Sequence, residues 1–248
     1  WILTTDADCI VPKNWLLTLD RYIQQNQPEM IVGAVMYKVK NNWFHHFQQL
    51  DLMSLQGTTI GSFGIGKPFM CNGANFAYTK TFFNAIGGFG GISDKASGDD
   101  VLLLQKAINA NKNNVHYLKN TDVIVKTKPE NDLFKLFMQR VRWAGKTTGY
   151  DSNYAKILAI VVLLMNLGLV IGCGLSVVGK LDWTTTLAVF VVKYSVDYVL
   201  LNQSNLYLRK GKFFVPIASS VLYPFFCSLV GLYSLFGSFT WKGRRFSN

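Results

Sequence analysis

The amino-acid sequence predicts an α/β domain over residues 1–128, an amphipathic helix within 129–156 and a membrane region over 157–248. In the first part, short apolar runs typical of strands alternate with helical patterns. A basic amphipathic stretch follows at 131–146. Long apolar runs then fill the last part, and the first of them is long enough to cross the ~30 Å of hydrocarbon in a bilayer.

The chain opens with a short strand that runs into two carboxylates, Asp6 and Asp8. Because Trp1 already stands within this apolar strand, we expect the complete protein to have further residues before it. Ligands of open α/β sheets gather at the carboxyl ends of strands, and side chains two residues apart share a face of an extended segment. The pair therefore suits a hard divalent cation. A solvated turn is the alternative, because Asp favours turns.

Periodicity and turn residues predict the remaining elements of the first part. Helices are expected over 14–25 and 42–55, and a strand over 30–39. Short strand-like runs at 116–118 and 122–126 should close the sheet.

Glycines punctuate the middle of the chain. Residues 57–66 are rich in glycine, Asn72 and Gly73 fit a tight turn, and 75–78 fit a strand. Residues 87–91 should end a short helix and open a flexible loop. For any single glycine a plain turn is the simpler interpretation.

Two further carboxylates, Asp99 and Asp100, follow Gly98 and head a predicted helix over 101–108. The helix dipole favours negative charge there, and acidic capping of an ordinary helix would explain the pattern by itself. Gly-Asp-Asp also occurs in polymerase active sites, at a turn between strands. Because the residues that follow predict a helix, we discount a polymerase.

Histidine and cysteine give no sign of a metal centre. His45 and His46 are adjacent and cannot share a helix face, so we expect them at the surface or beside a substrate. The cysteines form no Cys-x-x-Cys pair and two lie in apolar runs, which predicts buried thiols in a reducing compartment. They are Cys9, Cys71, Cys173 and Cys227.

The stretch NDLFKLFMQRVRWAGK, residues 131–146, predicts an amphipathic helix that Asn131 or Asp132 can cap. At about 100° per residue, its polar face holds Lys135, Gln139, Arg142 and Lys146. Its apolar face holds Leu133, Phe134, Phe137, Val141 and Ala144. A basic amphipathic helix just before an apolar run suits the membrane interface. A surface helix packed on a soluble core is the alternative.

Three apolar runs, 157–179, 183–201 and 213–239, predict membrane segments. The second contains Lys193 and Asp197, four residues apart on one helix face, which must pair or line the interior of the bundle.

The third run lies between two basic clusters, LRKGK and WKGRRF. A plain third span would place the second cluster on the outer side, against the positive-inside rule. We therefore predict that 213–239 enters the membrane and turns back, helped by Pro216 and Pro224.

The order Asp-x-Asp, Asp-Asp, QxxRW and membrane spans resembles the membrane-embedded family 2 glycosyltransferases, the group that contains cellulose synthase and related sugar-polymer and lipid glycosyltransferases. Each motif alone is weak, but their order and spacing together are specific, and the resemblance covers nearly the whole chain. It implies a GT-A fold, a Rossmann-like α/β sandwich of which this chain holds a part.

The resemblance also implies an inverting glycosyltransferase that moves a sugar from a nucleotide-diphosphate sugar to a lipid or saccharide acceptor. Asp6 and Asp8 would bind Mg²⁺ or Mn²⁺ and the donor, and Arg142 would offer a planar fork to the diphosphate. Asp100 would be the general base, with Asp99 in place of the commoner Glu. The acceptor side would hold Gln139, Trp143 and Asn75.

The chain carries a formal net charge of +11. Residues 1–156 hold 17 Lys and Arg against 12 Asp and Glu, and residues 157–248 hold 8 against 2. No basic-aromatic nucleic-acid motif stands out, so anionic membrane lipid and the nucleotide diphosphate explain the charge more simply. By resemblance, the protein is expected in the bacterial inner (plasma) membrane, with its catalytic part cytosolic.

Two other functions stay open. A non-catalytic polytopic transport subunit could use Lys193 and Asp197 as a relay, although the Asp-rich first part would then be unexplained. A metal-dependent nucleotidyl or phosphoryl transferase could use the same carboxylates.

Overall fold

The computed structural model describes most of the chain, namely residues 1–90, 98–145, 152–210, 217–241 and 244–247. It divides into two compact units. Unit 1 comprises Trp1–Pro129 and Gln203–Phe213. Unit 2 comprises Glu130–Asn202 and Phe214–Asn248. The predicted positions of Lys146 and Pro216 lie outside the described residues.

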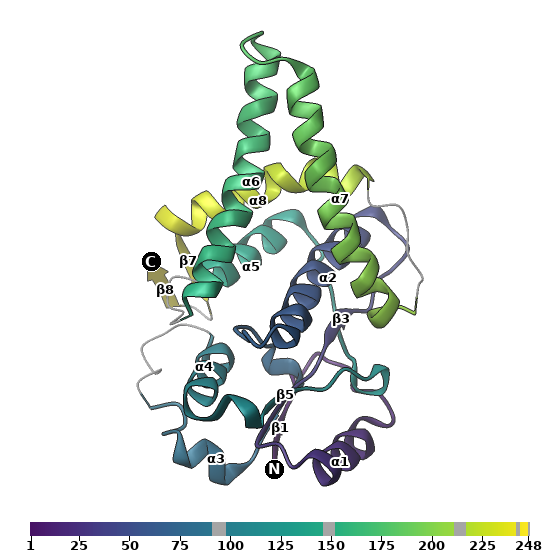
Figure 1. Ribbon diagram of the computed structural model, residues 1–248, viewed down its shortest axis with the longest axis vertical. Coiled ribbons are helices and arrows are strands. Elements are labelled where there is room, and N and C mark those ends of the chain that lie inside the picture. The colour runs from purple at the N-terminus through teal and green to yellow at the C-terminus, as the bar shows by residue number, and fades with distance from the viewer. Residues whose placement is uncertain (91–97, 146–151, 211–216, 242–243, 248) are drawn as a thin grey trace. The chain divides into compact units, whose positions relative to one another are not determined.

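A mixed four-stranded sheet organises unit 1 (Figure 1). Its strands, in spatial order, are β1 (Ile2–Thr4), β4 (Phe76–Tyr78), β2 (Met30–Val32) and β5 (Val115–Tyr117). Strand β4 is antiparallel to β1 and β2, and β2 is parallel to β5. In register, Thr4 and Val32 both lie opposite Phe76, and Tyr117 lies opposite Val32. The carboxyl ends of β1, β2 and β5 therefore share one edge with the start of β4.

The single strand predicted over 30–39 is wrong, because the chain divides there into β2 and β3 (Val35–Tyr37). Strand β3 leaves the first sheet and pairs in parallel with β6 (Val125–Thr127). Asn75 occupies the point of division: its side-chain nitrogen donates to the carbonyl of Ala34 at 2.7 Å. A Cβ at Gly33 would lie 2.4 Å from that same nitrogen, so only glycine allows this approach.

The helices of unit 1 agree with the sequence-based prediction more closely than its strands do. They are α1 (Trp15–Asn26), α2 (Trp43–Gly64), α3 (Lys80–Ala85) and α4 (Asp99–Asn111), and 3₁₀ turns occupy Gly73–Asn75, Lys112–Asn114 and Thr121–Val123. The predicted helices over 14–25 and 101–108 are confirmed as α1 and α4. The helix predicted to end at residue 55 continues to Gly64, because its buried core positions outweigh the low helix propensity of its glycines.

His45 corrects the expectation of a surface histidine pair. It is buried in the first turn of α2, where its Nδ1 accepts a hydrogen bond from the Lys40 amide at 3.0 Å. His46 is only partly buried, and burial lowers its pKa, helped by the charge of Arg209. The separation of the two side chains agrees with their adjacency on a helix.

The core of unit 1 forms where α1 packs on the sheets. It joins residues of α1 with residues of β2, β3, β4 and β6 and of the turns beside them. Its buried members are Trp15, Leu19, Ile31, Val35, Ala74, Ala77, Leu118, Val123 and Val125. All four cysteines lie in the described residues, and none of them forms a disulfide. Burial of the thiol was expected for all of them but is confirmed for Cys71 alone, because Cys9, Cys173 and Cys227 are only partly buried.

Unit 2 contains the apolar helices. Its elements are α5 (Leu133–Gly145), α6 (Asn153–Val177), α7 (Trp183–Leu208, whose last turns belong to unit 1), α8 (Ile217–Phe236), and a hairpin of β7 (Ser238–Trp241) and β8 (Arg244–Ser247). Among the described residues, α6, α7 and α8 are each long and apolar enough to cross a membrane.

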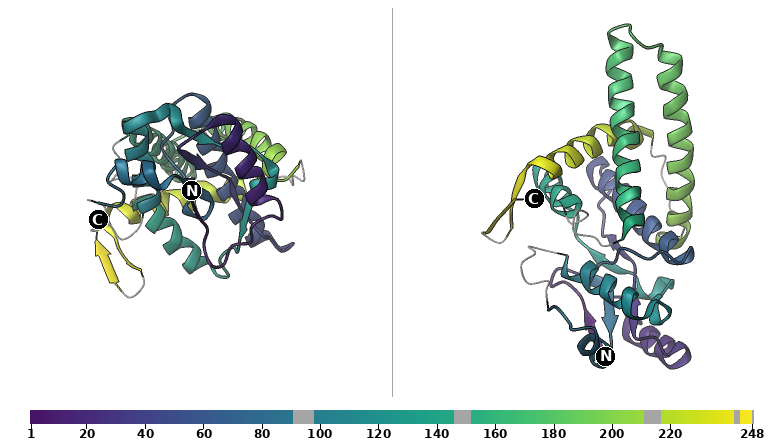
Figure 2. Two further views of the ribbon diagram at one scale, coloured as in Figure 1. Left: turned by 90° about the horizontal axis from the view of Figure 1, so that it is seen from below. Right: turned by 60° about the vertical axis from the view of Figure 1, so that its left-hand side comes forward.

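Helices α6 and α7 run antiparallel as a hairpin, and α8 lies across α6 (Figures 1 and 2). Gly231 of α8 marks the close approach, since a Cβ there would lie 2.6 Å from a methyl carbon of Leu163 in α6. The turn predicted inside the third apolar run does not occur between Ile217 and Phe236, because the helix continues through Pro224. A proline removes one backbone donor, which an apolar helix tolerates when its neighbours pack closely.

Helix α5 forms as predicted, but its faces differ in part from the expected ones. Phe137 makes edge-on ring contacts with Phe226 and Tyr233 of α8, so this side packs on an apolar helix. Leu133 and Phe134 stay 61% and 71% exposed. Two exposed apolar side chains at the start of a basic amphipathic helix are typical of a membrane interface.

Candidate active site

The carboxyl end of β1 is tied directly to the turn that precedes β4. The Thr4 hydroxyl donates to the carbonyl of Gly73 at 2.5 Å and lies 3.1 Å from the carbonyl of Phe76. The first of these carbonyls belongs to the 3₁₀ turn that Asn72 caps by accepting from the Ala74 amide. The Asp-x-Asp segment therefore leaves the sheet beside the Asn-Gly turn.

Asp6, Asp8 and Cys9 form a cluster of potential metal ligands just beyond β1. One ligand atom from each lies within 4.8 Å of the others, and both carboxylates are exposed. The Cys9 amide donates to the carbonyl of Asp6 at 3.0 Å, which closes the turn. Ile10 then forms an antiparallel bridge with Lys126 of β6, which fixes the end of the segment.

The donor set fits a divalent cation. Two carboxylates supply the hard oxygen ligands that Mg²⁺ and Mn²⁺ prefer. Burial raises the pKa of the Cys9 thiol, and the charges of Asp8 and Asp6 raise it further. A protonated thiol is a poor ligand for a hard cation, so the carboxylates are the donors on which the fit depends. The sequence did not predict that Cys9 belongs to this cluster, although its position directly after Asp8 could have suggested it.

Asp99 and Asp100 head α4 after Gly98, as predicted. Asp100 is half-buried, and its Oδ2 accepts from the Gly73 amide at 2.9 Å while its Oδ1 accepts from the Val101 amide at 2.9 Å. Asp99 is exposed, and its charge adds to burial in raising the pKa of Tyr78.

Gly73 thus joins two motifs that are far apart in the sequence. Its carbonyl accepts from Thr4, two residues before Asp6, and its amide donates to Asp100. The fold therefore brings the predicted base to the same edge of the sheet as the predicted metal carboxylates. Thr4 itself was not predicted, because a hydroxyl at the end of a strand carries no sequence signal of such a contact.

Asn75, predicted on the acceptor side, is only 3% exposed. Its amide nitrogen donates to the carbonyls of Ala34 and Val123, both at 2.7 Å, and its oxygen accepts from the indole of Trp15 at 3.1 Å. These contacts give Asn75 a structural role at the sheet edge. Contact with an acceptor stays a prediction.

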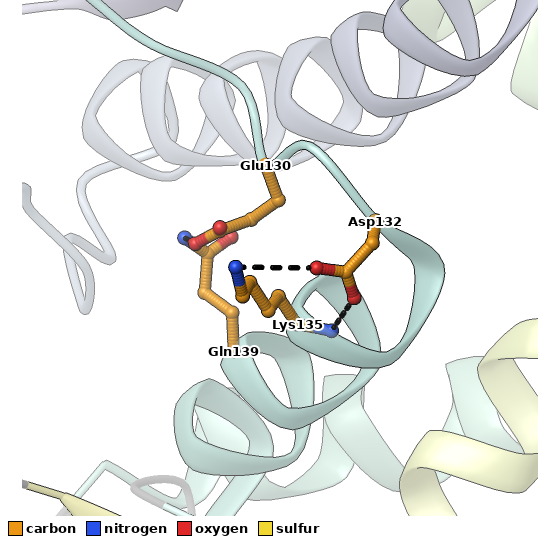
Figure 3. Close-up of polar contacts among 4 residues, drawn as sticks. All are labelled: Glu130, Asp132, Lys135 and Gln139. Carbon is orange, nitrogen blue, oxygen red and sulfur yellow. Dashed lines mark hydrogen bonds and ion pairs between the residues drawn. The ribbon is translucent and has the colours of Figure 1, made fainter.

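The QxxRW residues lie on α5 in unit 2. The amide nitrogen of Gln139 donates to the Glu130 carboxylate at 2.8 Å, and Figure 3 shows these two side chains meeting beside the first turn of the helix. Asp132 caps that turn by accepting from the Lys135 amide at 2.8 Å, as predicted for one of two candidate caps. This hydrogen bond is the main cause of the lowered pKa of Asp132.

Arg140 was not predicted as a site residue, although it lies between Gln139 and Arg142 in the same motif. It is only 5% exposed, donates to the side-chain oxygen of Gln139, and places its guanidinium carbon 4.2 Å from the centroid of the Trp143 ring. Arg142 and Trp143 are partly buried. A guanidinium stacked on an indole is a recognised cation–π arrangement.

One family model covers most of the chain. A model described as "Glycosyl transferase family group 2" matches residues 1–237. No curated protein matches the sequence. The match includes both pairs of carboxylates, the QxxRW helix and all three apolar helices. The chain is therefore a member of the family 2 group of glycosyltransferases.

Proposed function

We propose that this protein is an inverting glycosyltransferase that moves a sugar from a nucleotide-diphosphate sugar to a lipid or saccharide acceptor at the cytosolic face of a membrane. The observation that carries the proposal is the link through Gly73, which holds Asp100 at the sheet edge where Asp6 and Asp8 emerge. Family membership supports sugar transfer over the transport-subunit and nucleotidyl-transferase alternatives. The proposed catalytic fold is of the GT-A type.

Asp6 and Asp8 would hold Mg²⁺ or Mn²⁺ together with the donor. When bound, such a cation neutralises charge on a nucleotide diphosphate. Both carboxylates are exposed beyond β1, where a charged ligand can reach them. Arg142 would contribute a planar, permanently charged fork that matches the oxygens of a diphosphate.

Asp100 would act as the general base. As the acceptor oxygen forms a bond to the anomeric carbon, the bond from that carbon to the diphosphate oxygen breaks. The electron pair of the broken bond leaves with the nucleoside diphosphate, and the acceptor proton passes to Asp100. One displacement inverts the anomeric configuration. The two backbone hydrogen bonds to Asp100 fix the orientation of its carboxylate for this transfer.

Trp143 would form the acceptor end, with its indole face against a sugar ring or a lipid head group. Gln139 and Asn75 would support this end, since their described hydrogen bonds are to protein groups. Asp99, exposed beside Asp100, would border the reacting groups.

The experiment is an assay of the purified protein in bilayers against a panel of nucleotide sugars, with a membrane lipid extract as acceptor. Asp100→Asn should lower transfer on the order of 10²- to 10⁴-fold and leave donor binding unchanged, because asparagine keeps the shape of the side chain and one oxygen for the Gly73 amide, and only the acceptor of the Val101 amide is lost. Asp20→Asn, at an exposed carboxylate on α1, is the matched control. Wild-type turnover by Asp100→Asn would end the assignment of the base.

A further inference from the structure

Arg140 is a buried cation on a helix whose other basic residues are partly or fully exposed in the described part of the chain. Burying a guanidinium costs free energy unless its charge and its donors are compensated. Two neighbours on α5 contribute to this compensation: the side-chain oxygen of Gln139 and the ring of Trp143. Both belong to the QxxRW motif.

These contacts form a continuous series within unit 2. Glu130 accepts from the nitrogen of Gln139 at 2.8 Å, and the oxygen of Gln139 accepts from Arg140. The guanidinium of Arg140 then stacks 4.2 Å from the centroid of the Trp143 ring. Residues 140 and 143 are three apart on a helix, so their side chains are neighbours. The amide of Gln139 is thereby committed on both its nitrogen and its oxygen to protein partners.

A planar guanidinium on one face of an indole has two effects on that ring. It limits rotation of the side chain, because tilting the ring would break a desolvated cation–π contact. It also covers that face, so that a further flat group can stack only on the opposite one. A lysine could not do the same, since its ammonium is a point charge without a plane.

We propose that Arg140 is a positioning residue for the acceptor: it fixes the plane of Trp143 and leaves one face of the indole for a sugar ring or a lipid head group. This inference rests on the proposed function for the identity of the ligand. The contact between Arg140 and Trp143 is independent of the proposed function, and it can be measured without sugar transfer.

The first readout is the accessibility of Trp143 to acrylamide. The contribution of Trp143 to the fluorescence is the difference between a protein and its Trp143→Phe variant, measured once with Arg140 and once with Arg140→Met. We expect stronger quenching of Trp143 in Arg140→Met, an intermediate value in Arg140→Lys, and no change in Lys135→Met, which removes an exposed cation from the same helix. Equal quenching in Arg140→Met and wild type would overturn the proposal.

The second readout uses the donor that the nucleotide-sugar panel identifies and a membrane lipid extract as acceptor. Arg140→Met should raise the half-saturating concentration of the extract about 2- to 30-fold, the range expected for loss of a cation–π contact, with the donor KM unchanged. In the Trp143→Phe background the same substitution should have a smaller effect, because Arg140 acts through that ring.

Additive effects of the two substitutions, or an equal rise in the donor KM, would refute a positioning role. If Arg140→Met does not fold, Arg140→Lys takes its place, and we expect quenching of Trp143 to be stronger in it than in the wild type. Equal quenching of Trp143 in Arg140→Lys and the wild type would then refute the proposal. If the wild-type protein transfers no sugar from the panel, the proposed function fails, and the quenching measurement still decides whether Arg140 covers Trp143.

Discussion

Replacing Asn75 by alanine would remove a side chain that joins three separate segments of unit 1. Its nitrogen donates to the carbonyls of Ala34 and Val123, and its oxygen accepts from the indole of Trp15. The carbonyl of Ala34 also accepts from the Val125 amide at 3.1 Å, so it would keep a partner. The carbonyl of Val123 and the Trp15 indole would each lose the hydrogen bond that Asn75 supplies.

The magnitude follows from these two groups. Each buried polar group left without a partner costs about 1–3 kcal/mol, so Asn75→Ala should lower the free energy of unfolding by about 2–5 kcal/mol after allowing for non-additivity. Asn75→Asp should be worse, because it brings a carboxylate oxygen against two carbonyl oxygens. Asn84→Ala, at an exposed asparagine on α3, should change stability by less than about 0.5 kcal/mol.

Thermal unfolding of the purified full chain, followed by tryptophan fluorescence, measures the effect. For a chain of this size, each kcal/mol corresponds to about 2–4 °C in Tm, so Asn75→Ala should lower Tm by about 4–20 °C. If Asn75 instead contacts the acceptor without supporting the fold, the variant would keep its Tm and lose transfer. A Tm equal to that of Asn84→Ala would refute the structural role.

Three further predictions concern the donor site and the topology. Excess chelator should abolish turnover and Asp8→Ala should weaken nucleotide-diphosphate binding, whereas full turnover in chelator would exclude a metal role. Arg142→Lys should weaken donor binding on the order of tenfold, because lysine cannot form a bidentate contact; a lysine variant with wild-type donor affinity would make Arg142 an ordinary interfacial cation. A reporter after Asn248 should lie on the same side as the catalytic part, because the positive-inside rule keeps Arg244 and Arg245 there; since α8 continues through Pro224 without a turn, this requires that α8, which lies across α6, does not cross the bilayer, and a signal from the outer face would show that it does.

The elements that the sequence predicted are those whose causes are local. Helix α1 follows from apolar spacing, and α4 begins where Gly98 and two acidic residues predict a start. The apolar helices α6 and α7 follow from composition, and α7 only runs further than the predicted end at residue 201 because its last turns belong to unit 1.

The features that the sequence did not predict depend on contacts between distant residues. Gly33 within the run 30–39 permits a break in the strand, but nothing in that run indicates that Asn75, 41 residues after Ala34, occupies the break. The site shows the same division: Asp100 was predicted from its motif, whereas its link to Thr4 through Gly73 required the structure.

The charged pair in α7 bears on the choice between an enzyme and a transport subunit. A relay would require Lys193 or Asp197 to exchange its partner along a path through the membrane. Lys193 is instead hydrogen-bonded to Asp197 one turn further along the same helix, and its ammonium lies 5.6 Å from the ring centroid of Tyr223 on α8. Its side chain is only 9% exposed. A pair that neutralises its own charge and holds one helix against another accounts for both residues, so their presence in an apolar helix does not require a transport function.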